Sequence, residues 1–181
     1  LLDDVTAVNQ NVDVAAMGSG YVLVYEDQYW EGDGALDITT YFVSETGVAG
    51  VFNNASDFRG LGGVPESWEE SEGASVVWMG GDYALVAATA RYGVTDRDVF
   101  VRVMDVTAPS EVISEFDPIR LFNDSTSSED EAGVSLAALG GDRYAAIFNN
   151  ITDGLVERQS IDLVRTLTSD GDGDTLTVVD F

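Results

Sequence analysis

The sequence predicts an all-β fold, a β-propeller-like array of three four-stranded antiparallel blades with about 60 residues each. A strand–turn–strand unit built around a glycine-containing turn occurs three times, over residues 12–25, 74–87 and 134–148. Met17, Met79 and Leu139 occupy the same place in the three units, at spacings of 62 and 60 residues. No apolar i, i+3, i+4 pattern continues for three turns, so little helix is expected.

The first unit is followed by two further strands. Its Gly18-Ser19-Gly20 turn joins two arms of apolar, β-branched and aromatic residues. A polar loop over residues 26–34 leads to a third strand over residues 35–43, and a fourth strand is predicted over residues 48–52. Residues 1–11 precede the unit and are expected to form the tail strand of a preceding blade or a closure strand.

The same order of elements follows the second and third units. Third strands are predicted over residues 98–104 and 161–167, and fourth strands over residues 112–116 and 176–181. Small residues such as Ala15 and Ala16 indicate that the first arm of each unit is innermost, where blades crowd around an axis. Residues 1–181 thus form a single all-β repeat domain, with predicted blades at residues 12–73, 74–132 and 133–181.

Two other all-β architectures are the alternatives to blades. A β-sandwich requires no repeat of about 60 residues, and the repeats of a β-solenoid are usually shorter. Three blades are fewer than the four to eight that usually close a ring. The chain is therefore expected to be part of a longer array or to be completed by association with other copies, for instance two chains into six blades.

The charge of the chain is strongly negative. It has 33 Asp and Glu residues against 8 Lys and Arg, all of them Arg, which gives a formal net charge of −25. Such a surface repels nucleic-acid phosphates and anionic lipids, so neither nucleic acid nor a membrane surface is an expected partner. No apolar run approaches the ~18 residues that span a bilayer, so membrane insertion is not expected.

Two explanations account for this acidity. One is a secreted or cell-surface protein in calcium-rich or saline water, and the other is halophilic adaptation, in which carboxylates keep the chain soluble at high salt. His and Cys are absent as well as Lys, so disulfides and the usual proton shuttles and strong nucleophiles are missing. The expected location is extracellular or at the cell surface.

A family resemblance accompanies these residues. The apolar arm, the Gly80-Gly81-Asp82 and Gly140-Gly141-Asp142 turns, the Tyr-led strand and the Phe52-Asn53 step resemble extracellular propeller repeats. They are similar to integrin-type FG-GAP blades and to the blade repeats of large, acidic, calcium-associated surface proteins. The resemblance implies an adhesive or structural role. The family's Asp-x-Asp-x-Asp-Gly calcium loop is absent from all three glycine turns.

One acidic turn is a candidate calcium site. Asp170, Asp172 and Asp174 alternate with glycines, which let a loop curl around an ion that prefers oxygen ligands. The EF-hand pattern fails, because Thr175 stands at its sixth position and Phe181 at its twelfth. A polar hairpin turn, which also favours Asp-Gly, is the alternative.

Three Asn-x-Ser/Thr sequons are candidate glycosylation sites. They place the acceptor amide at Asn54, Asn123 and Asn150, in predicted loops or at strand ends.

Loop aromatics and carboxylates are weaker candidates for ligand contact. Trp30 and Trp68 lie in acidic loops, where they either contact a partner or carbohydrate or cover a neighbouring blade. Glu26 and Asp33 lie near Trp30, as do Glu31 and Asp37, so a paired-carboxylate glycosidase is conceivable. A solvated acidic loop is the interpretation that we favour.

The function expected from the sequence is a non-catalytic, extracellular structural or adhesive module of a cell-surface or filament assembly. A carbohydrate-binding module or lectin that uses the loop aromatics is the alternative, and a fragment of a carboxylate-dependent glycoside hydrolase is the third. Other copies of the chain or neighbouring blades are the expected partners, with glycans as further candidates. Calcium is the one cofactor considered.

Overall fold

The computed structural model describes residues 9–27, 37–47, 49–54, 70–81, 83–91, 97–105, 119–120, 131–141, 143–152, 154–165 and 174–180. These residues form β-strands and turns, and they contain no helix. The all-β prediction is thereby confirmed. None of the described segments is a helix with the length and apolar character needed to cross a bilayer.

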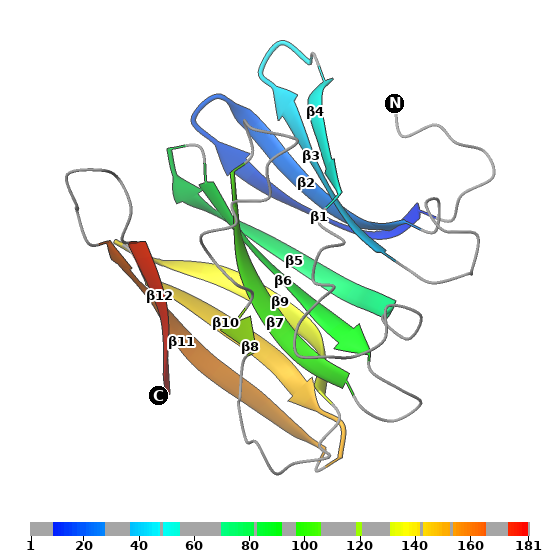
Figure 1. Ribbon diagram of the computed structural model, residues 1–181, viewed down its shortest axis with the longest axis vertical. Coiled ribbons are helices and arrows are strands. Elements are labelled where there is room, and N and C mark those ends of the chain that lie inside the picture. Colours follow the sequence, from blue (N-terminus) through cyan, green and yellow to red (C-terminus); the bar gives the residue numbers. More distant parts are fainter. Residues whose placement is uncertain are drawn as a thin grey trace.

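The strands form three antiparallel sheets in chain order (Figure 1). Sheet A has the order β1-β2-β3-β4, built from β1 (Asn9–Met17), β2 (Gly20–Asp27), β3 (Asp37–Ser44) and β4 (Ala49–Asn54). Sheet B has the order β5-β6-β7-β8, built from β5 (Glu70–Gly80), β6 (Tyr83–Arg91), β7 (Arg97–Asp105) and β8 (Ile119–Arg120). Sheet C has the order β9-β10-β11-β12, built from β9 (Glu131–Gly140), β10 (Arg143–Asn150), β11 (Leu155–Arg165) and β12 (Asp174–Asp180).

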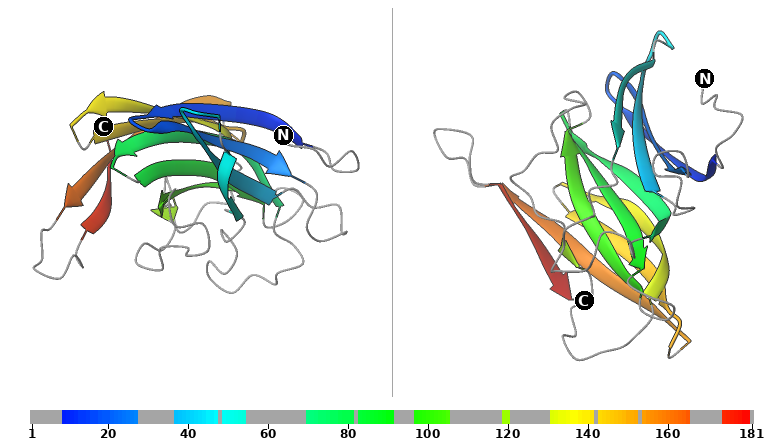
Figure 2. Two further views of the ribbon diagram at one scale, coloured as in Figure 1. Left: turned by 90° about the horizontal axis from the view of Figure 1, so that it is seen from above. Right: turned by 45° about the vertical axis from the view of Figure 1, so that its right-hand side comes forward.

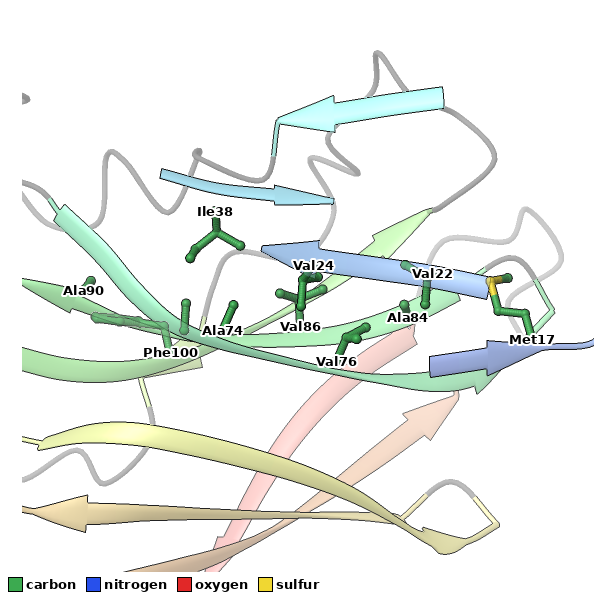
Figure 3. Close-up of a cluster of buried hydrophobic side chains, with 11 residues drawn as sticks. Met17, Val22, Val24, Ile38, Ala74, Val76, Ala84, Val86, Ala90 and Phe100 are labelled. Carbon is green, nitrogen blue, oxygen red and sulfur yellow. The ribbon is translucent and has the colours of Figure 1, made fainter. Parts of the chain in front are cut away.

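Sheet B lies between the other two sheets. Its second strand, β6, is buried on both faces, because Ala84 to Ala90 are all buried. Ala84 and Val86 belong to the cluster shared with sheet A, whereas Leu85 and Ala87 belong to the cluster shared with sheet C. This is the alternation of side chains along a strand. Figure 3 shows the first cluster, in which Met17, Val22, Val24 and Ile38 of sheet A face Ala74, Val76, Ala84, Val86, Ala90 and Phe100 of sheet B.

The first strands of the sheets lie closest together. Strand β5 contacts β1 and β2 on one side and β9 on the other. On the opposite side of the molecule the last strands, β4, β8 and β12, spread apart (Figure 2, left). The first strands therefore make most of the contacts between neighbouring sheets.

Each first strand carries a β-bulge at the same place in the repeat. Asn11, Gly73 and Gly133 have φ angles of 52°, 64° and 71°, in the left-handed region that glycine adopts freely and Asn tolerates. The pairing register of β1 with β2, β5 with β6 and β9 with β10 shifts around these residues. A bulge bends a strand without ending it.

The bulges explain why strands begin earlier than predicted. The predicted blade starts at residues 12, 74 and 133 lie within β1, β5 and β9, which begin at Asn9, Glu70 and Glu131. Asn9 pairs with Asp27, so residues 9–11 belong to the first sheet and not to a separate tail strand. The polar and glycine residues at the bulges resemble turn residues in the sequence, but here they continue the strand.

Two strands extend further than the sequence predicts. The loop predicted from residue 26 begins later, because β2 continues to Asp27 and pairs with β3 along its whole length. In the third sheet the predicted unit ends at residue 148, whereas β10 continues to Asn150, which pairs with Leu155 across a tight turn. Polar side chains at these strand ends are typical of loops, whereas antiparallel pairing extends both strands by two residues. The predicted fourth strand at residues 112–116 lies outside the described residues.

Candidate functional site

A carboxylate on β1 forms the first hydrogen-bonded contact between sheets. Asp13 Oδ2 accepts a hydrogen bond from the Ser75 hydroxyl at 2.8 Å and another from the Val76 amide at 2.9 Å. Both donors belong to β5, and hydrogen bonds to an ionised acceptor are the stronger kind. Asp13 lies two residues after Asn11, the residue of positive φ in the β1 bulge.

The same contact recurs between sheets B and C. Ser75 Oγ accepts a hydrogen bond from the Leu136 amide at 3.0 Å, while its proton goes to Asp13. A hydroxyl can do both, because it has one donor and two acceptor lone pairs. We call Asp13, Ser75 and Ser135 the acceptor positions, and Val14, Val76 and Leu136 the amide positions. In each observed contact an acceptor position binds the amide position of the following sheet.

A second carboxylate ties the bulges of sheets A and B together. Glu26 Oε1 accepts hydrogen bonds from the Gly73 amide at 2.5 Å and from Asn11 Nδ2 at 2.8 Å. Only 1% of Glu26 is exposed. Its place at the end of β2 therefore differs from the solvated loop that the sequence predicts. The carboxylate satisfies a bulge amide that would otherwise be buried without a partner.

The residue equivalent to Glu26 in sheet B is Thr89. Glu26 pairs with Gln10 and Thr89 pairs with Glu72, immediately before the bulge in each first strand. Thr89 is fully buried, and its hydroxyl has no hydrogen-bond partner in the described part of the chain. Nearby, Glu72 and Arg97 form an ion pair with an Oε1 to Nε distance of 3.0 Å.

These carboxylates hold the sheets together. Asp13 and Glu26 each accept two hydrogen bonds from other strands or bulge residues, and the second oxygen of Asp13 accepts the Val14 amide at 2.8 Å. The described residues contain no group of three or more His, Cys, Asp or Glu side chains that could hold a metal ion.

The predicted site residues fall into three groups. Asn150 lies in β10, is 2% exposed and pairs with Glu131, so a glycan there would require this side chain to leave its buried position. Asn54 is the last residue of β4 and Asp174 the first of β12, and the structure describes only their backbone. The remaining candidates lie outside the described residues: Trp30, Trp68, Asn123, Asp170 and Asp172.

Sequence reasoning missed the acceptor positions. The signal was present as Asn11-Val12-Asp13, Gly73-Ala74-Ser75 and Gly133-Val134-Ser135, which recur at the 62- and 60-residue spacings of the turns. Each triplet places a residue that tolerates positive φ two positions before a short oxygen-bearing side chain. This pattern indicates a bulge followed by a side-chain acceptor.

The outer faces of sheets A and C expose apolar side chains. On sheet A these are Val12, Val14 and Tyr21. On sheet C they include Leu139, Ile147 and Val156. An apolar sheet face that meets solvent is typical of an interaction surface.

Comparison with known proteins assigns no family. No protein-family model and no curated protein matches the chain. Among solved structures, the chain is similar to a subtype N10 neuraminidase-like protein of A/little yellow-shouldered bat/Guatemala/060/2010, with a TM-score of 0.34 and 7% identity. The alignment covers 95% of this chain and 59% of that one. A match of this size identifies neither a family nor an activity.

Proposed function

We propose that the chain is a non-catalytic structural or adhesive module of an extracellular cell-surface or filament assembly. In this proposal the three sheets are blades of a propeller-like array. The fanned arrangement of sheets A, B and C around their first strands supports the array.

One observation carries the proposal. Sheet B buries both of its faces, whereas sheets A and C each bury one face and expose apolar side chains on the other. A module that functions alone would be expected to cover such faces with polar residues. A module built to continue into further sheets leaves them apolar.

The use of the carboxylates supports a structural role. Asp13 and Glu26 both accept hydrogen bonds across the contact between sheets A and B, from backbone amides and the Ser75 hydroxyl. Glycoside hydrolysis requires two carboxyl groups that face a shared sugar-binding space. The hydrogen bonds of Glu26 instead join the bulges of sheets A and B.

A glycan array tests the proposal against its main alternative. The chain, labelled on its N-terminal amine because it has no Lys, should bind no glycan selectively. The same preparation, incubated with chromogenic glycosides, should release no product. Trp78 of β5 packs against the first core cluster and provides the control. Selective sugar binding that is lost in Trp30→Ala or Trp68→Ala, and retained in Trp78→Phe, would replace the structural role with a lectin role.

A further inference from the structure

The outer face of sheet C is the counterpart of a face that is buried in sheet B. Leu139 stands at the place of Met79, and their exposed fractions are 50% and 6%. Val156 pairs with Asn149 as Val99 pairs with Thr89, and their exposed fractions are 68% and 0%. Met79 and Val99 are buried because sheet C covers them. Sheet C therefore presents the same type of surface, and no sheet among the described residues covers it.

The outer face of sheet A is the counterpart of the opposite face of sheet B. Val12 stands at the place of Ala74, with exposed fractions of 57% and 9%. Val14 likewise corresponds to Val76, which packs against sheet A. The two ends of the chain thus carry the two halves of one type of sheet-to-sheet interface.

The hydrogen-bond pattern points the same way. Asp13 and Ser75 each accept the amide of the following sheet, from Val76 and Leu136. The third acceptor position, Ser135, is exposed on the outer side of sheet C. At the other end the first amide position, Val14, donates within its own strand to Asp13 Oδ1 at an exposed site. One end offers an acceptor, and the other offers the amide that fits it.

We propose that the outer face of sheet C docks on the outer face of sheet A of a second copy of this chain. In this contact the Val14 amide of the partner exchanges its exposed bond to Asp13 Oδ1 for one to Ser135 Oγ, while Leu139 and Val156 cover Val12 and Tyr21. The inference rests on the proposed structural role and names the partner. The contact is head to tail. When the second chain docks its own sheet C on sheet A of the first chain, the two contacts close a ring of two chains.

Charge sets the conditions for this association. Two chains with a formal net charge of −25 each repel one another. Salt screens this repulsion, and the Debye length falls to ~3 Å at 1 M. The docking faces are apolar, so their attraction does not weaken with salt. Dimerisation should therefore strengthen as NaCl is raised.

Analytical ultracentrifugation of single-face variants tests the contact. In 1 M NaCl the wild-type chain should sediment with the mass of two chains. Val156→Arg on sheet C and Val12→Arg on sheet A should each prevent closure and weaken association at least tenfold. Ser135→Ala, which removes one hydrogen bond, should weaken it about fivefold. Ile151→Arg places the same charge on an exposed turn residue and should leave the mass unchanged.

Mixing the two face variants distinguishes head-to-tail from symmetric contacts. The intact C face of Val12→Arg can bind the intact A face of Val156→Arg, so an equimolar mixture should form dimers that neither variant forms alone. If the C face instead paired with another C face, Val12→Arg would dimerise like wild type. Circular dichroism confirms that each variant is folded.

The outcomes separate this inference from the proposed function. A monomeric wild-type chain, or dimers unaffected by Val156→Arg, would overturn the docking proposal. Either result would leave a structural role within an array of other sheets intact. Selective glycan binding by an intact dimer would overturn the structural role and leave the docking contact in place.

Discussion

Asp13 and Ser75 are 62 residues apart and join the first two sheets by a hydrogen bond of 2.8 Å between Oγ and Oδ2. The pair occupies equivalent positions of neighbouring repeats. The hydrogen bond therefore joins neighbouring sheets through a side chain at the same position of each repeat.

Replacing Asp13 tests this link. Asp13→Ala removes the acceptor of two hydrogen bonds and should lower the free energy of unfolding by ~2–3 kcal/mol. Asp13→Ser installs the residue that holds this position in the other two sheets and should recover part of the loss. Urea unfolding followed by circular dichroism measures both. An Asp13→Ala variant as stable as wild type would show that the link contributes nothing.

The buried hydroxyl of Thr89 predicts a stabilising substitution. Thr89→Val replaces an oxygen that has no partner in the described part of the chain with a methyl group of similar size. The free energy of unfolding should stay equal or rise by ~1 kcal/mol. Ser75→Ala is the matched control, because it removes a hydroxyl with two partners and should cost ~1–2 kcal/mol. A destabilised Thr89→Val variant would mean that this hydroxyl is bonded in solution.

Close backbone approach makes Gly20 sensitive to substitution. A Cβ at Gly20 would overlap the Val43 carbonyl and lie 2.8 Å from Ser44 Cα, so β2 and β3 would have to separate locally. Gly20→Ala should cost more than ~3 kcal/mol. Gly81→Ala meets nothing within 4 Å, and its φ of +57° predicts a cost of ~1–2 kcal/mol. Equal urea midpoints for the two variants would contradict the close approach.

The net charge predicts that salt stabilises the fold. With 33 acidic side chains against 8 basic ones, self-repulsion should fall as NaCl is raised. The urea midpoint should rise steeply up to ~1 M salt, where screening is nearly complete, and only slowly above it. Sucrose, which strengthens burial without screening, should not reproduce the steep part. A midpoint that falls with NaCl would contradict the prediction.

The alternation of Asp170, Asp172 and Asp174 with glycines makes this segment a candidate calcium site, with a polar hairpin turn as the alternative, and calcium titration distinguishes the two. Titration calorimetry should detect one ion with a Kd of ~10⁻⁴–10⁻³ M, the range of extracellular modules. Asp172→Asn removes one carboxylate charge and should weaken binding at least tenfold. Asp37→Asn, on β3, is the control and should leave binding unchanged. Identical titrations for wild type and Asp172→Asn would identify this segment as a polar turn.

The repeat could be predicted from the sequence, whereas several strand limits could not. The hairpins were predicted from local signals. These are the turn residues around Gly18 and Gly140 and the β-forming residues on either side of each turn. Gly73 and Gly133 are equally local but ambiguous, because a bulge and a turn both favour positive φ. A bulge forms where the residues before the glycine pair with the neighbouring strand, and a turn forms where they do not.

The candidate site was harder to predict than the fold. Glu26 was expected in a solvated loop, because a carboxylate beside Asp27 and Gln28 is typical of one. Its burial depends on the amide of Gly73, which lies 47 residues away. A buried carboxylate requires a hydrogen-bond donor as partner. The residues around Glu26 in the sequence do not indicate which distant donor that is.

The sequence by itself determined that similar hairpins recur, because strand alternation and turn chemistry act over a few neighbouring residues. The tertiary structure decided which acceptor meets which amide, and which apolar faces are covered. Those contacts join residues 61 to 63 positions apart. They form only when the sheets pack, because a hydrogen bond requires donor and acceptor to lie about 3 Å apart. That distance does not depend on how far apart the two residues lie in the sequence.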